Sequence, residues 1–131
     1  MTFLKRFAEW FRLKEKLDAS SHNVPLAKER EIWWVSLGEN VGSEMGGKNQ
    51  LFSRPALIIK KLTRGFFLVA PTTTKPHEGS WYVKVRLGEL DEYVCLNQIR
   101  TIDYRRMYSL LGQLDGADFA RVKEGFNKLY R

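Results

Sequence analysis

The segment at residues 42–74 reads GSEMGGKNQLFSRPALIIKKLTRGFFLVAPTTT and contains two apolar runs bounded by turn-forming residues. The runs at residues 56–59 and 66–70 have the length of buried strands, and Gly65 between them predicts a β-hairpin. In an antiparallel hairpin, the start of the first strand lies beside the end of the second. Arg54 is therefore predicted to lie next to the threonines at residues 72–74, at a sheet rim beside a glycine-rich loop.

The segments that flank this hairpin predict further short strands. They are expected at residues 31–37, 81–86, 92–96 and 98–102, with loops at residues 38–53 and 74–80. Residues 81–86 alternate, so one face is predicted to be buried (Trp81, Val83, Val85) and the other to face solvent (Tyr82, Lys84, Arg86). The long loop at 38–53 is either a flexible insertion or a lid over the rim. The fold class predicted is mainly β with helices: a small, strongly curved antiparallel barrel.

Both ends of the chain have helical patterns. Residues 2–17 predict an N-terminal amphipathic helix with Thr2 as N-cap and an apolar stripe made of Phe3, Phe7, Trp10, Phe11 and Leu17. This helix packs on the domain or on a second copy, lies on a membrane surface, or docks another protein. Residues 103–106 predict a short helical turn, and Asp115 predicts the N-cap of a C-terminal helix. The buried stripe of that helix is expected to be Phe119, Val122, Phe126 and Leu129.

Three segments follow from these patterns: an N-terminal helix at 1–18, a linker at 19–30 that contains His22 and Pro25, and a barrel domain at 31–131. The formal net charge of the chain is +7, and it is spread over both halves. A basic protein favours polyanions, which indicates a nucleic acid or an acidic protein as partner. No segment has the features of a membrane span or signal peptide, and the single Cys95 fits a buried thiol in a reducing compartment. We therefore expect a cytoplasmic protein.

Four fragments of the chain occur in an order that resembles the MazF/PemK toxins. They are residues 42–44, residues 54–56 at the head of a strand, residues 71–74, and the segment LNQIRTID at 96–103. The similarity covers residues 31–130 and leaves out the first thirty. It implies an SH3-like barrel of the MazF/PemK/CcdB type with a C-terminal helix, usually a homodimer. It also favours the lid interpretation of the long loop.

The resemblance implies a toxin endoribonuclease that cuts single-stranded RNA, with Arg54 and Thr73 as catalytic residues. Arg54 has the planar fork that matches two phosphate oxygens, and Thr73 can donate a hydroxyl hydrogen bond to the same group. Glu44 is suited to be the general base or, alternatively, anchors its own loop and pairs with Arg54. His77 is either an acid for the leaving oxygen or an exposed loop residue. Substrate contacts are expected from Ser43, Lys48, Ser53, Thr72, Thr74, Lys75, Tyr82, Lys84 and Gln98.

The chain contains no metal-ligand motif and no phosphate-binding glycine loop, so neither a metal nor another cofactor is expected. The partners implied are single-stranded RNA, a cognate antitoxin with an acidic, extended segment, and a second copy of the chain. A different class of function shares this architecture, since relatives of the fold poison DNA gyrase. A non-catalytic module that binds protein or nucleic acid is therefore the alternative.

Overall fold

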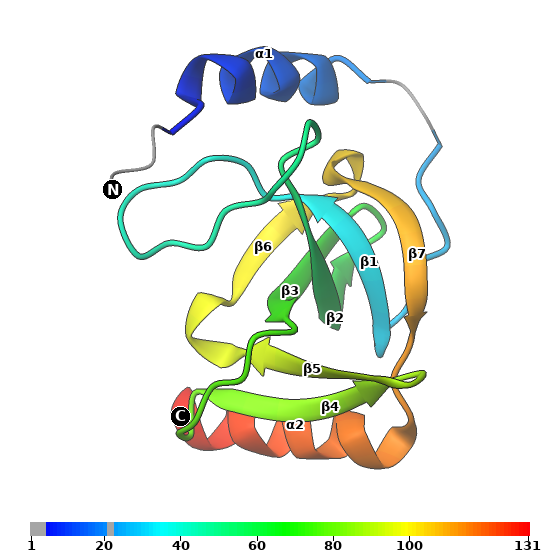
Figure 1. The fold of residues 1–131 in the computed structure, drawn as a ribbon. Helices are drawn as coiled ribbons and strands as arrows, with labels where there is room; N and C mark the ends of the chain where they lie inside the picture. The colour runs from blue at the N-terminus through cyan, green and yellow to red at the C-terminus, as the bar shows by residue number, and fades with distance from the viewer. Residues whose placement is uncertain (1–4, 21–22) are drawn as a thin grey trace.

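The computed structural model describes residues 5–20 and 23–131, so Thr2, Phe3 and His22 lie outside the described residues. It contains seven strands, two α-helices and two short 3₁₀ turns in these residues (Figure 1). The elements are α1 (Phe7–Asp18), β1 (Glu31–Ser36), β2 (Ser53–Thr63), β3 (Phe66–Thr73), β4 (Tyr82–Leu87), β5 (Leu90–Cys95), η1 (Leu96–Gln98), β6 (Arg100–Asp103), η2 (Tyr104–Arg106), β7 (Met107–Gln113) and α2 (Gly116–Leu129). The predicted mainly β class with a helix near each end is confirmed.

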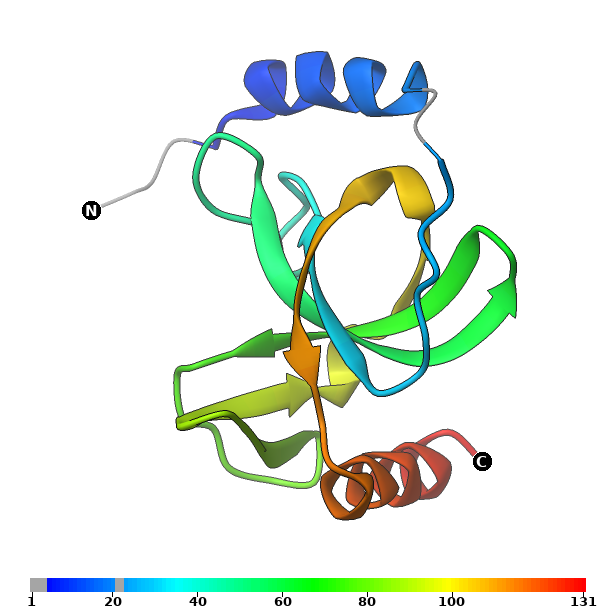
Figure 2. The same cartoon turned by 90° about the vertical axis from the view of Figure 1, so that its right-hand side faces the viewer.

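The strands form one antiparallel, strongly curved sheet. Its hydrogen-bonded order is β4-β5-β3-β2-β1-β7, and β6 pairs with β3 beside this path. No pairing joins β4 to β7 among the described strands, so the sheet is open rather than closed by hydrogen bonds. In two views, α1 lies across one end of the sheet and α2 across the opposite end (Figures 1 and 2). The rim between these helices holds the long loop, the start of β2 and the end of β3.

The predicted hairpin is the centre of the sheet. Strands β2 and β3 pair from Ala56 opposite Pro71 to Thr63 opposite Phe66. Both faces are covered, because Leu57 belongs to one core cluster and Ile58 to a second cluster on the other side. This explains why the strands are continuous apolar runs rather than alternating ones. The hairpin is longer than predicted, and the first threonines are part of β3 instead of following it.

Helix α1 begins at Phe7, later than the predicted Thr2 start, and packs on the long loop. Trp10 is 7% exposed and lies 5.6 Å from the Phe52 ring, centroid to centroid. The predicted stripe is only partly correct, because Phe7 and Phe11 are 51% and 61% exposed. Within the described part of the chain, no helix combines the length and hydropathy needed to cross a bilayer.

Two other sequence predictions were wrong in detail. Trp81 is 43% exposed: it precedes β4, and its ring meets that of Tyr130 edge-on, with centroids 6.2 Å apart, near the end of α2. The strand expected at 98–102 begins at Arg100, since residues 96–98 form the turn η1 instead. Strand β7 was not predicted: most of its residues are exposed, so it lacks a buried-strand pattern. The helical turn at Tyr104–Arg106 is confirmed.

The predicted cap of α2 is confirmed, and it supports a stability test. The Asp115 side chain accepts a hydrogen bond of 2.7 Å from the Asp118 amide. Phe119 and Val122 below it are buried, and Phe126 and Leu129 pack against the same cluster. Replacing Asp115 by alanine should lower the free energy of unfolding by about 1 kcal/mol, because a helix-end amide loses its acceptor. Urea unfolding measures this, and Glu124→Ala on the exposed face of the helix should have a smaller effect.

Candidate functional site

Two cavities at the rim share four lining residues, Lys48, Arg54, Thr73 and Thr74. We call the pair the rim groove. The first cavity, of about 380 Å³, is also lined by Trp34, Asn49, Ser53, Pro55, Thr72, Leu90, Glu92 and Leu111. The second, of about 370 Å³, is also lined by Ser43, Met45, Lys75, His77, Tyr82, Cys95, Asn97 and Gln98. The hairpin therefore brings Arg54 and Thr73 to one groove, as the antiparallel register requires.

Arg54 stands near the start of β2 with its side chain half-buried in the groove wall. Its Nε donates a 2.9 Å hydrogen bond to the Gly46 carbonyl. Because Nε alone of its guanidinium nitrogens is bonded among the described residues, the two terminal nitrogens are left for a ligand. Burial lowers the pKa of Arg54, and the neighbouring Cys95 and Glu92 oppose that shift. A guanidinium nevertheless stays charged at all ordinary pH values.

The hydroxyl residues of the groove differ in accessibility. Thr73 is partly exposed, and its Oγ1 accepts a 3.2 Å hydrogen bond from the Lys75 amide, so the oxygen keeps its own proton to donate. Thr72 and Ser53 are buried. Thr72 Oγ1 donates to the Pro55 carbonyl, and Ser53 Oγ accepts from the Tyr108 hydroxyl at 2.8 Å. These two predicted contact residues are thus engaged with the protein itself.

The long loop forms one wall of the groove and is fixed on both sides. On the groove side, the Gln98 side chain accepts from the Met45 amide at 2.9 Å and donates to the Ser43 carbonyl at 3.0 Å. Gln98 therefore bridges the loop to the β5–β6 connection and orients the wall.

On the far side of the loop, the two residues before α1 hold the loop backbone. Arg6 donates a 2.9 Å hydrogen bond to the Asn49 carbonyl, and its guanidinium lies 4.0 Å from the centre of the Phe52 ring. Lys5 donates to the Asn40 carbonyl at 2.6 Å. The N-terminal helix, which the resemblance did not explain, is thus packed against the wall of the site.

Glu44 does not line the rim groove. Its Oε1 accepts a 2.9 Å hydrogen bond from the Val41 amide, so it anchors a turn within the loop. It lines a neighbouring cavity that shares Gln98 with the rim groove, and its charge acts on Arg100 rather than on Arg54. The loop-anchoring interpretation agrees with this contact, although the suggested proximity to Arg54 is not found.

His77 and Tyr82 form a flat aromatic surface in the second cavity. Their rings are stacked with centroids 4.4 Å apart and planes within 10°. With Lys75 and Lys48 nearby on the groove lining, the cavity combines cations with an aromatic face. Such a combination suits a phosphate backbone with a stacked base.

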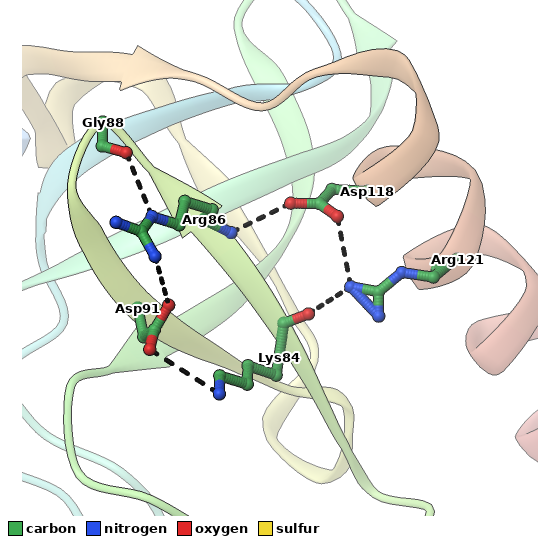
Figure 3. Close-up of polar contacts among 6 residues, drawn as sticks. All are labelled: Lys84, Arg86, Gly88, Asp91, Asp118 and Arg121. Carbon is green, nitrogen blue, oxygen red and sulfur yellow. Dashed lines mark hydrogen bonds and ion pairs between the residues drawn. The ribbon is translucent and has the colours of Figure 1, made fainter.

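Lys84 lies outside the rim groove, contrary to its predicted role at the substrate. Its Nζ is 3.6 Å from a carboxylate oxygen of Asp91, which also pairs with Arg86 at 3.6 Å (Figure 3). On the other side of β4, the Asp118 carboxylate accepts from the Arg86 amide at 2.9 Å, and Arg121 donates to the Lys84 carbonyl. These contacts join β4, β5 and α2, which indicates a structural role.

Sequence reasoning missed Glu92, which lies in the first cavity with Arg54. It is only 4% exposed, and its Oε2 has no hydrogen-bond partner among residues 5–20 and 23–131. Burial raises the pKa of Glu92, and the charge of Arg54 opposes that shift. The residue stands in the segment LDEYVC, whose sequence alone does not indicate that this acid is buried. Its register partner is Val85, which was predicted to be buried, but only the fold shows that the two residues pair.

Cys95 is buried, as expected, and lies next to Arg54 in the second cavity. Burial raises the pKa of its thiol to about 11, against the opposing effect of Arg54. The thiol is therefore neutral near pH 7 and unsuited to nucleophilic attack. Within residues 5–20 and 23–131, no three His, Cys, Asp or Glu side chains are grouped so that they could hold a metal ion.

Comparison with known protein families identifies the family to which the chain belongs. A family described as "PemK-like, MazF-like toxin of type II toxin-antitoxin system" matches residues 28–130. The chain belongs to this family. The resemblance inferred from sequence motifs is confirmed, and the PemK-like, MazF-like match leaves α1 outside, as the motifs did.

Solved structures of MazF proteins have the same fold. A MazF from Deinococcus radiodurans has a TM-score of 0.67 at 22% identity, and the match covers 82% of this chain and 97% of that one. The Mycobacterium tuberculosis toxin MazF-mt6 has a TM-score of 0.59 at 18% identity, covering 77% and 96%. A mycobacterial endoribonuclease in complex with its cognate antitoxin has a TM-score of 0.59 at 15% identity, covering 78% and 92%. A comparison with curated proteins gave no match. At these identities, the structural likeness of this PemK-like, MazF-like chain to the solved structures establishes only its fold.

Proposed function

We propose that this protein is the toxin of a toxin–antitoxin pair and acts as a metal-independent endoribonuclease on single-stranded RNA. Membership of the toxin family supports the class. The observation that carries the proposal is the presence of Arg54 and Thr73 in one basic groove, with Lys48 on the shared lining. The SH3-like description of the sheet, and the division of the chain at residues 18 and 30, are part of the same proposal.

The chemistry proposed uses the ribose 2′-hydroxyl as nucleophile. It attacks the adjacent phosphorus, the bond to the 5′-oxygen breaks, and a 2′,3′-cyclic phosphate remains. The free terminal nitrogens of Arg54 bind the phosphoryl oxygens, and Thr73 donates a hydrogen bond to the same group. Each such donor supplies about 3 kcal/mol of transition-state stabilisation.

Two protons must also move in this reaction. His77 lines the second cavity and is placed to protonate the leaving 5′-oxygen. Glu44 lines the adjoining cavity, so it acts as general base only on RNA that passes over Gln98. The stacked rings of His77 and Tyr82 offer a face for one base.

The proposed partners follow from the same surface. An antitoxin with an acidic, extended segment would occupy the basic groove in place of RNA, and structures of MazE-MazF complexes support such a partner. A second copy would cover the apolar side of β7, where Tyr108, Leu110 and Leu111 are 46%, 51% and 39% exposed. An RNA substrate and an antitoxin place the protein's action in the cytoplasm.

A chelator experiment tests the proposed function. Purified protein is incubated with a long single-stranded transcript in excess EDTA, and the fragment ends are analysed by mass spectrometry. We expect cleavage that is unaffected by EDTA and 2′,3′-cyclic phosphate ends, because the proposed groups need no metal. Cleavage that stops in EDTA and returns with Mg²⁺ would refute the mechanism. Binding of the transcript without cleavage would favour the alternative of a non-catalytic binding module.

A further inference from the structure

Glu92 is a buried carboxylate with an unusual position. It lies in the first cavity with Arg54 and is 4% exposed, and no group in the described part of the chain forms a hydrogen bond with its Oε2. Burying a carboxylate without full hydrogen bonding costs free energy, so such a group needs a compensating charge. Arg54 provides it, because its charge is the one that favours the Glu92 carboxylate.

The other groups around Glu92 leave Arg54 as its main partner. Lys48 from the long loop lines the same cavity but is exposed, and Cys95 on β5 itself is neutral near pH 7. The neighbouring strands β3 and β4 present Thr72 and Val85, which do not titrate. The buried Glu92 carboxylate therefore depends on the charge of the half-buried Arg54.

We propose that Glu92 is a positioning residue for Arg54: it holds the guanidinium at the groove and takes up a solvent proton when a phosphate binds there. A bound phosphate competes for the charge of Arg54. The Glu92 carboxylate then loses its favourable interaction in a site where desolvation already opposes ionisation, so its affinity for a proton rises. The part of this inference that concerns catalysis rests on the proposed nuclease function, but the coupling of the two side chains does not.

The coupling is tested first by stability, without RNA. Because burial raises the pKa of Glu92, the folded protein binds its proton more readily than the unfolded chain, and this contribution to stability is lost as pH rises above about 4.5. Glu92→Gln should melt at the wild-type temperature at pH 4 and above it at pH 8. In the Arg54→Ala background, the gain from Glu92→Gln at pH 8 should be larger, since the compensating charge is gone. A gain that is equal in both backgrounds, or a variant that is destabilised equally at both pH values, would overturn the proposal.

The role at the substrate is tested by kinetics and by proton uptake. With a transcript whose cut site has been mapped, Glu92→Gln should lower kcat at least about tenfold while KM stays the same or falls, because one negative charge leaves the groove. Titration calorimetry with a 2′-O-methyl oligonucleotide that spans the site, in buffers of different ionisation enthalpy, should show greater proton uptake by the wild type than by the variant. Glu89→Gln removes an exposed acid from the β4–β5 turn and serves as control.

Outcomes separate the two proposals. Wild-type kinetics together with unchanged proton uptake in Glu92→Gln would overturn the positioning role. An inactive wild-type protein would refute the nuclease, and the stability experiment would still decide whether Glu92 and Arg54 are coupled.

Discussion

Replacing Arg54 by alanine should slow RNA cleavage by about a hundredfold or more. In the proposed mechanism, the substitution removes the planar donor to the scissile phosphate, and loss of one such preorganised donor raises the barrier by about 3 kcal/mol. The measurement is single-turnover cleavage of a labelled transcript in EDTA. Arg54→Lys keeps the positive charge but not the planar pair of donors, so its cleavage rate should lie between those of the wild type and Arg54→Ala.

The controls for Arg54 concern folding and charge. Arg64 lies exposed in the turn at the opposite end of β2, so Arg64→Ala removes the same charge and should cut at the wild-type rate. Alanine at position 54 leaves the Gly46 carbonyl without its donor, and the variant must be shown to be folded at the assay temperature by circular dichroism. A folded Arg54→Ala protein that cuts as fast as the parent would remove Arg54 from the site.

Replacing Gly47 by alanine should destabilise the protein more than any other glycine-to-alanine substitution in the loop. A Cβ at this position would stand 1.7 Å from the Phe52 carbonyl oxygen and 1.9 Å from its carbon. These are backbone atoms, so no rotamer change relieves the clash. The paired hydrogen bonds between Lys48 and Ser53, at 2.8 and 2.9 Å, must then open directly beside Arg54. We expect a loss of about 3 kcal/mol in the free energy of unfolding, the upper range for overpacking, and a large fall in cleavage.

A second glycine in the same loop provides the comparison. Gly42 has a positive φ of +56°, but a Cβ there would meet nothing within 4 Å. Gly42→Ala should therefore cost only the strain of the left-handed conformation, about 1 kcal/mol, and leave cleavage unchanged. Urea unfolding and the cleavage assay are applied to both variants. If the two glycines tolerate alanine equally well, the loop is not built around the tight Gly47 turn.

The N-terminal helix lies outside the part of the chain that matches the family. Trp10 and Arg6 contact the outer side of the loop whose inner side lines the groove. A Cβ at Gly38 would lie 2.2 Å from the Trp10 ring, so the glycine is what permits this close approach. The helix therefore supports the groove wall, although its exposed Phe7 and Phe11 are not used in this contact.

Features of the fold that depend on residues close together in the sequence could be predicted, and features that depend on contacts between distant segments could not. Apolar runs around Gly65 predicted the hairpin, and its register alone brought Arg54 to Thr73. The cap at Asp115 was equally local. The predicted start of α1 and the predicted burial of Trp81 were wrong. Packing on a remote loop decides the first, and the position at a sheet end decides the second. The direction of Glu44 and the strand β7 likewise depend on contacts that no short pattern encodes.

The sequence by itself determined the family, the central hairpin, and the convergence of a guanidinium with a threonine hydroxyl, since strand pairing follows from hydrophobic pattern and turn residues. Only the tertiary structure decided which acid shares the groove with Arg54. Glu92 is far from Arg54 along the chain, and it is buried in a strand that pairs with both β3 and β4. The physical reason is that desolvation and charge pairing depend on which atoms surround a group in space, and neither is visible in the order of the residues.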